Sequence, residues 1–227
     1  MKKIIYLIPS IIILFIFVFY IGNVFRNYYI FTKINESFNN FSNADSLYIK
    51  VYFGQDSTTQ YEYMQYNEKS AQTVSEINNT TNENNLLYTT YFDSNDYYDI
   101  QYNSNTVTKN SGNSLIISYL PTLPYSSQTN ENILSSSSLR WQYSFSLGTR
   151  ISSKTYNGID CYAITLLEYD KMYPDRFYTI FVDKNTFIPI YINDNGTETF
   201  YEIKTNTINE DDFNFPLTTE ELENLND

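Results

Sequence analysis

The stretch that decides the fold runs from Thr149 to Leu166 and reads TRISSKTYNGIDCYAITL. Two segments of strand-forming residues flank the dipeptide Asn157-Gly158. Asn-Gly is a favoured two-residue turn between paired antiparallel strands, because both residues tolerate a positive φ. The stretch therefore predicts a β-hairpin with strands at Thr149–Tyr156 and Ile159–Leu166.

Strand patterns continue on both sides of this hairpin. The side chains Leu47, Ile49, Val51 and Phe53 alternate with Tyr48, Lys50 and Tyr52, which is the period of two typical of a β-strand. Further strands are expected at Thr59–Tyr66, Leu86–Phe92, Tyr97–Tyr102, Ser114–Leu120, Arg176–Val182, Phe187–Ile192 and Thr197–Lys204. The pattern predicts an α+β fold that is mostly β, with one curved antiparallel sheet and a helix packed against it.

That helix is expected from Asn27 to Asn43, where Ile30, Ile34, Phe38 and Phe41 recur at helical spacing. The prolines and the serine run of Pro121–Ser138 predict a long connection, with one short helix near Asn132–Leu134. A short acidic helix is expected at Thr219–Leu225.

An apolar run from Ile4 to Gly22 follows Lys2 and Lys3 and contains no charged residue. As a helix it reaches roughly 27 Å, just enough to cross a hydrocarbon core of about 30 Å. The lysines place the N-terminus in the cytoplasm and the rest of the chain outside. The flank after Gly22 lacks the small residues of a cleavage site, which favours an uncleaved anchor, with a cleaved signal peptide as the alternative. The expected division is an anchor at 1–26, an extracytoplasmic domain at 27–216 and an acidic tail at 217–227.

Composition excludes several chemistries. The 227 residues include no histidine and one cysteine, Cys161, so histidine-based triads and thiolate metal cages are excluded. Cys161 alternates with Ile159 and Ala163 and is expected to pack as a small apolar side chain. We expect no catalytic residues, no metal and no cofactor; Asp194-Asn195-Gly196 is better explained as a hairpin turn than as a calcium loop.

Charge narrows the range of partners. Without Lys2, Lys3 and Arg26, the chain keeps 11 of its 14 basic residues against 26 acidic ones, a net charge of 11 − 26 = −15. Such an acidic exterior argues against nucleic acid and against anionic lipid headgroups as partners. The membrane itself, an apolar ligand and another envelope protein remain possible.

The chain has 24 Tyr and 16 Phe, and the strands around Phe181 and Ile190 are apolar on both faces. A sheet with one solvated face should alternate apolar with polar residues, so both of these faces must be covered. The cover could be a core, a helix, a partner or a ligand. Tyrosine also simply suits strands, so an aromatic-lined cavity is one interpretation of two.

Three motifs resemble the lipoprotein-carrier (LolA-like) superfamily of bacterial envelope proteins. They are Asn157–Ile164, then Val182–Ile190 with its D-x-x-T-x-x-P pattern, then Asp212–Pro216 with its D-x-F-x-F-P pattern. The resemblance implies an incomplete β-barrel whose concave face holds an acyl chain, with the helix at Ile30–Phe41 and the loop Pro121–Ser138 as plug or lid.

Together with the apolar strand faces, the resemblance predicts a bacterial, membrane-tethered and non-catalytic domain that binds a lipid, a lipoprotein or another apolar ligand. The expected ligand-binding residues are Ile49, Val51, Phe53, Ile180, Val182 and Ile190. The alternative is a protein-interaction or sensor module in envelope assembly or signalling. Soluble carriers are released into the periplasm whereas this chain is expected to be tethered, and the arginine of the true carriers cannot be placed in this sequence. Ferrying of lipoproteins is therefore not expected.

Overall fold

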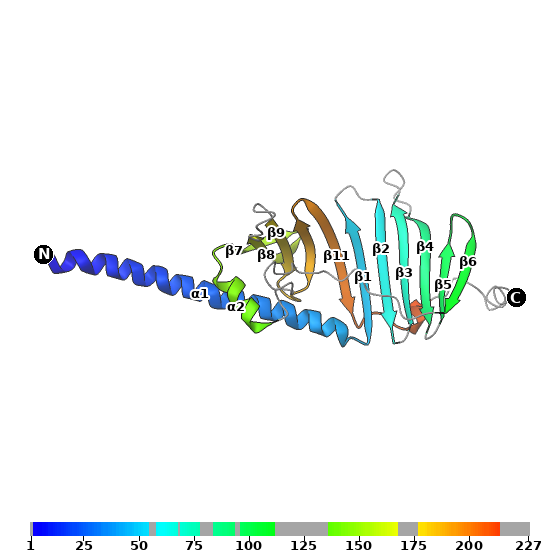
Figure 1. Ribbon diagram of the computed structural model, residues 1–227, viewed down its shortest axis with the longest axis horizontal. Helices are drawn as coiled ribbons and strands as arrows, with labels where there is room; N and C mark the ends of the chain where they lie inside the picture. The colour runs from blue at the N-terminus through cyan, green and yellow to red at the C-terminus, as the bar shows by residue number, and fades with distance from the viewer. Residues whose placement is uncertain are drawn as a thin grey trace. The chain divides into compact units, whose positions relative to one another are not determined.

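The structure is a computed structural model of the chain and describes residues 2–54, 58–67, 69–77, 84–93, 96–111, 136–167 and 177–213. The chain divides into two compact units (Figure 1). Unit 1 contains residues 1–38 and 122–188, and unit 2 contains residues 39–121 and 189–227. Each unit is therefore built from two separate stretches of sequence.

Unit 2 contains eight described strands in the order β6-β5-β4-β3-β2-β1-β11-β10. Their bounds are β1 Ser46–Phe53, β2 Thr59–Tyr66, β3 Lys69–Ile77, β4 Asn84–Asp93, β5 Asp96–Gln101, β6 Thr106–Ser111, β10 Pro189–Asp194 and β11 Thr197–Thr205. Every neighbouring pair is antiparallel. β1 lies between β2 and β11, so the last of the described strands pairs with the first.

Asparagine supplies the tight turns of unit 2. Asn67, Asn105 and Asn195 have φ values of 52°, 52° and 50°, a left-handed conformation that asparagine tolerates better than most residues. At the β10–β11 turn, Gly196 follows with φ 96°, and its N–H donates to Asn193 Oδ1 at 2.9 Å. The expected hairpin turn at this position is confirmed.

Unit 1 contains most of helix α1 (Lys2–Ser42), helix α2 (Ser137–Phe145) and three strands, β7 Thr149–Tyr156, β8 Ile159–Leu167 and β9 Phe177–Asp183. β8 pairs with β7 on one side and with β9 on the other, both antiparallel. The predicted hairpin is confirmed, with Asn157 at φ 49° and Gly158 at φ 79°. Cys161 lies in β8 and is buried, as expected.

Helix α1 has two contrasting parts. From Ile11 to Phe19 every side chain is exposed, although every one is apolar. From Val24 onward one face is buried, at Val24, Asn27, Ile30, Phe31, Ile34, Ser37 and Phe41. The helix is long and apolar enough to cross a membrane, a property that a signal sequence shares. The part without protein cover therefore ends near Gly22.

The expected fold class, mostly β and antiparallel with a long apolar helix at the start, is confirmed. Four elements were not foreseen. They are β3 and β6, whose sequences are largely polar, α2, which begins at Ser137 inside the expected connection Pro121–Ser138, and the 3₁₀ turn η1 at Glu210–Asp212. β10 begins at Pro189 rather than Phe187, because Phe187 has φ 57° and cannot extend a strand.

Some expectations lie outside the described residues. These are the strand at Ser114–Leu120, the helix near Asn132–Leu134, most of the connection Pro121–Ser138 and the acidic helix at Thr219–Leu225.

Candidate functional site

Four of the six predicted ligand-binding residues lie in unit 2. Ile49 and Val51 alternate along β1 with Lys50 and Tyr52, so they share one face of the sheet, and both are at most 1% exposed. Ile49 is paired with Tyr63 of β2 and Ile203 of β11. Paired residues of antiparallel strands project to the same side, so this face is apolar across three strands.

The remaining two of these four lie on the same face but are less covered. Phe53 is 44% exposed, and its ring meets that of Tyr61 edge-on with centroids 5.6 Å apart. Thr199 pairs with both Phe53 and Ile192, and half-buried Ile190 lies two residues before Ile192 on β10. Ile190 therefore projects to the same side as Phe53.

Two tyrosines report a low-dielectric environment on this face. Tyr63 lies opposite Ile49, and Tyr201 lies opposite Val51 on the other side of β1. Burial raises the pKa of both phenols to about 12, because the phenolate loses its hydration there. The Tyr63 hydroxyl still donates to Gln65 Oε1 at 3.1 Å. The centre of this face is thus apolar, and the Tyr63 hydroxyl at its edge has a hydrogen-bond partner.

The opposite face of β1 is charged. Lys50 pairs with Glu62 at 3.2 Å, and the Tyr48 hydroxyl donates to the same carboxylate at 3.3 Å. Burial and the nearby Glu62 carboxylate raise the Tyr48 pKa well above its usual range. On β11, Lys204 pairs with Glu202 at 2.6 Å. This face of the central strands thus carries ion pairs, and also the stacked rings of Tyr52 and Phe200, whose centroids are 4.9 Å apart. It is called the polar face of unit 2 below.

The other two predicted residues, Ile180 and Val182, lie on β9 in unit 1 and have no exposed surface. Ile180 pairs with Ile164 of β8, which pairs with Ile151 of β7, so three isoleucines form a row across this sheet. Val182 pairs with Tyr162 on the same face.

Helix α1 lies on this face of unit 1. The Phe187 ring is 6.0 Å from that of Tyr162 and 6.2 Å from that of Tyr29, so it connects the sheet to the helix. The Ser37 hydroxyl donates to the Phe187 carbonyl at 2.8 Å. The helix thus covers the face that carries Ile180 and Val182. The six predicted residues are divided between the two units, four in unit 2 and two in unit 1.

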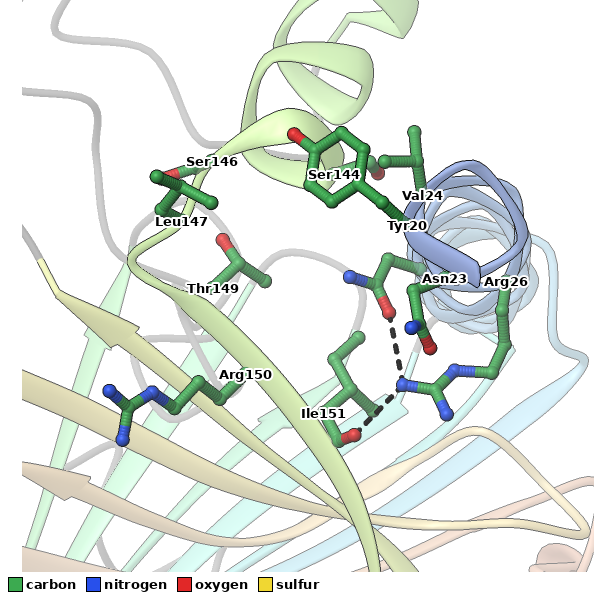
Figure 2. Close-up of a pocket in the computed structure, with 11 residues that line it drawn as sticks. Tyr20, Asn23, Val24, Arg26, Ser144, Ser146, Leu147, Thr149, Arg150 and Ile151 are labelled. Carbon is green, nitrogen blue, oxygen red and sulfur yellow. Dashed lines mark hydrogen bonds between the residues drawn. The ribbon is translucent and has the colours of Figure 1, made fainter. Parts of the chain in front are cut away.

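A cavity of about 330 Å³ lies in unit 1 where α1, the end of α2 and the start of β7 meet (Figure 2). Arg26 Nη2 donates to the Ile151 carbonyl at 2.9 Å and approaches Asn27 Oδ1 at 3.4 Å. The Tyr20 hydroxyl donates to the Phe145 carbonyl at 2.8 Å. None of the six predicted residues lines this cavity. Sequence reasoning missed it, because its lining residues come from two stretches, 20–27 and 144–151, that lie far apart in the sequence.

A second cavity, of about 240 Å³, lies on the polar face of unit 2. The Phe213 ring contributes to it and lies 6.4 Å from the rings of both Tyr66 and Tyr91. Lys69 pairs with Glu210 at 3.2 Å and holds the preceding 3₁₀ turn, η1 Glu210–Asp212, near β3. The six predicted residues do not line this cavity either.

The sequence motifs behind the family resemblance have structural roles in the described residues. Asp183 accepts hydrogen bonds from the Asn185 N–H and the Thr186 hydroxyl, both at 2.9 Å, which closes the turn after β9. Asp212 accepts from the Asn209 N–H at 2.8 Å and caps η1. These carboxylates stabilise turns, which accounts for both motif positions without catalysis.

No protein-family model matches the sequence, and no curated protein matches it significantly. Solved structures similar to the chain include three bacterial proteins. An uncharacterized conserved protein from Thermus thermophilus is 7% identical, with 80% of this chain and 93% of that chain covered and a TM-score of 0.39. A putative outer membrane lipoprotein-sorting protein domain from Vibrio parahaemolyticus is 12% identical, with coverages of 79% and 95% and a TM-score of 0.25. A LolA superfamily protein from Nitrosomonas europaea is 11% identical, with coverages of 75% and 88% and a TM-score of 0.22. Likenesses this weak assign neither a family nor a function to this chain.

Proposed function

We propose that the chain is a membrane-tethered extracytoplasmic protein of the bacterial envelope that binds a lipid, a lipoprotein or another apolar ligand without catalysis. One observation carries the proposal: the apolar face of unit 2 around Ile49 and Val51, with the desolvated phenols of Tyr63 and Tyr201 beside it. Such a face can accept an acyl chain by apolar contact.

The tether rests on α1. Nine consecutive exposed apolar side chains, Ile11 to Phe19, are costly in water and favourable in a bilayer. N-terminal sequencing of the mature protein, from both the membrane and the soluble fractions, tests the tether. A start at Met1 supports an uncleaved anchor, whereas a start near Asn23–Asn27 would make the protein secreted.

The ligand is tested in membranes with the full chain. Cells take up a fatty acid that carries a diazirine, which forms a covalent bond with neighbouring side chains on illumination, and labelled peptides are mapped by mass spectrometry. We expect labels on the β1 peptide in addition to labels on Ile11–Phe19, which serve as an internal positive signal. Val51→Trp should remove the β1 label only, and Val107→Trp in β6 is the control for the same replacement elsewhere in unit 2. Labels confined to α1 would leave the tether in place and refute the ligand.

A second candidate is a protein-interaction or sensor module. It is favoured because Ile49, Ile180 and Val182 have no exposed surface, so protein atoms already cover these positions. The same labelling experiment separates the two, since an interaction module would take no label on β1. A bifunctional protein crosslinker would then join it to a partner protein.

A further inference from the structure

Part of unit 1 is basic although the chain as a whole is acidic. The chain has four arginines, and three of them, Arg26, Arg140 and Arg150, belong to α1, α2 and the start of β7 in unit 1. No acidic residue occurs between Ile4 and Asn35 or between Ser136 and Ile159. These two stretches are basic within a chain of net charge −12. The two stretches that line the first cavity, 20–27 and 144–151, therefore carry positive charge and no acidic residue.

This basic region adjoins the exposed apolar part of α1. Arg26 follows Gly22 by four residues, which is about 6 Å along a helix. A lipid headgroup layer is roughly 5–7 Å thick on each side of the hydrocarbon core. If the bilayer covers α1 as far as Gly22, the Arg26 side chain reaches the level of the lipid phosphates.

Aromatic side chains gather at the same level. Trp141 of α2 stacks on Tyr28 with centroids 4.0 Å apart and meets Phe25 edge-on at 5.5 Å. Phe25 is 60% exposed and Leu147, just after α2, is 84% exposed. Tryptophan, tyrosine and exposed apolar side chains beside a membrane span are typical of the interfacial zone.

The cavity itself offers donors to an anion. Among the described residues, both hydrogen bonds of the Arg26 guanidinium use Nη2, so Nη1 and Nε remain able to donate. Within the described part of the chain, the buried Thr149 Oγ1 has no hydrogen-bond partner, although Thr149 lines this cavity. Figure 2 shows Thr149 between β7 and α1, and Arg150 extending on the side away from α1.

We propose that this junction of α1, α2 and β7 binds the phosphate of an anionic phospholipid in the leaflet from which α1 emerges, and seats α2 in the headgroup layer. Arg26 and Thr149 donate to the phosphate, and Arg150 adds attraction to the negative surface. The inference rests on the membrane tether of the proposed function and does not need the apolar ligand of unit 2.

The full chain, incorporated into nanodiscs, tests it. Trp141 is the only tryptophan of the chain, so its fluorescence reports on α2 alone. The discs contain phosphatidylcholine with increasing phosphatidylglycerol and a fixed fraction of headgroup-spin-labelled lipid as quencher. We expect quenching of Trp141 to increase with the phosphatidylglycerol fraction and to saturate.

Three variants separate the contributions. Arg150→Gln should raise the half-maximal phosphatidylglycerol fraction about fivefold, the factor for ~1 kcal/mol per basic residue near an anionic surface. Thr149→Val, which keeps the side-chain shape, should raise it at least threefold without lowering the melting temperature, since it removes an unsatisfied buried hydroxyl. Lys154→Gln, the same charge change further along β7, should have a smaller effect than Arg150→Gln.

The outcomes are distinguishable. Failure of the chain to enter nanodiscs would refute the tether and this inference together. Retention in the discs with equal quenching in phosphatidylcholine and phosphatidylglycerol would refute only the anionic site, as would Arg150→Gln and Thr149→Val variants that behave like the unaltered chain. If inorganic phosphate added to pure phosphatidylcholine discs gave the same quenching, the ligand would be a soluble anion and the lipid site would be refuted.

Discussion

Replacing Ile34 with aspartate tests whether the membrane-distal part of α1 is structural. Ile34 has no exposed surface, and Ser37, one turn further on, is held by its hydrogen bond to the Phe187 carbonyl. Loss of the buried isoleucine costs about 1.5–3 kcal/mol, and an unpaired carboxylate in its place adds several more. We expect Ile34→Asp to destabilise unit 1 by at least ~4 kcal/mol.

The measurement is thermal unfolding of the full chain in detergent micelles, followed by circular dichroism. For a chain of this size ~4 kcal/mol lowers the melting temperature by about 8–16 °C. Asn35→Asp is the matched control, because it adds the same carboxylate at the adjacent, half-buried position of the helix. Its melting temperature should change by less than about 2 °C.

The effect should depend on pH. Burial raises the pKa of the introduced carboxyl above the ~3.9 of the unfolded chain. Below about pH 4 the group is neutral in both states, and its charge penalty accumulates only as the pH rises above that value. The difference between Ile34→Asp and Asn35→Asp should therefore be larger at pH 7 than at pH 4. Equal melting temperatures at pH 7 would refute the reasoning and make this part of α1 an uncovered stalk.

Three further predictions concern single side chains. Burial raises the pKa of the Tyr63 and Tyr201 phenols to about 12, against about 10 in the unfolded chain. The stability that this shift contributes is present below pH 10 and is lost as the pH rises toward 12. Absorbance at 295 nm should show tyrosinate forming together with unfolding, and Tyr63→Phe should weaken this loss of stability. Cys161 has no exposed surface, so the folded chain should react with a thiol reagent at least 100-fold more slowly than the chain in denaturant, and equal rates would place it at the surface. Gly158→Ala should lower the stability by about 1–2 kcal/mol. The Gly158 φ is 79° and a Cβ there meets no atom within 4 Å, so the whole cost is backbone strain. Gly22→Ala is the control and should cost no stability, because Gly22 has open space and no positive φ.

The sequence predicted most strands because their signals are local. β1 alternates apolar and polar residues, and Asn157-Gly158 forms the turn that its chemistry favours. β3 was missed because its buried positions include Ser70, Ala71 and Ser75, small residues that carry no strand signal. Its pairing with β2 and β4 makes it a strand, and pairing is a long-range property.

Some residues of the candidate sites could likewise be identified from the sequence, and others only from the structure. Sequence alone identified the apolar positions Ile49, Val51, Ile180 and Val182, because periodicity shows which side chains share a face of one strand. Their role in binding a ligand stays a prediction. Sequence could not place Arg26 beside Ile151 or Trp141 against Tyr28, since each pair is separated by more than 110 residues and meets only when the hairpin and α2 pack on α1. Local chemistry determines strands, turns and the apolar anchor. Only tertiary packing brings distant cations and aromatic rings together around one cavity, because such contacts depend on chain topology and leave no periodic pattern in the sequence.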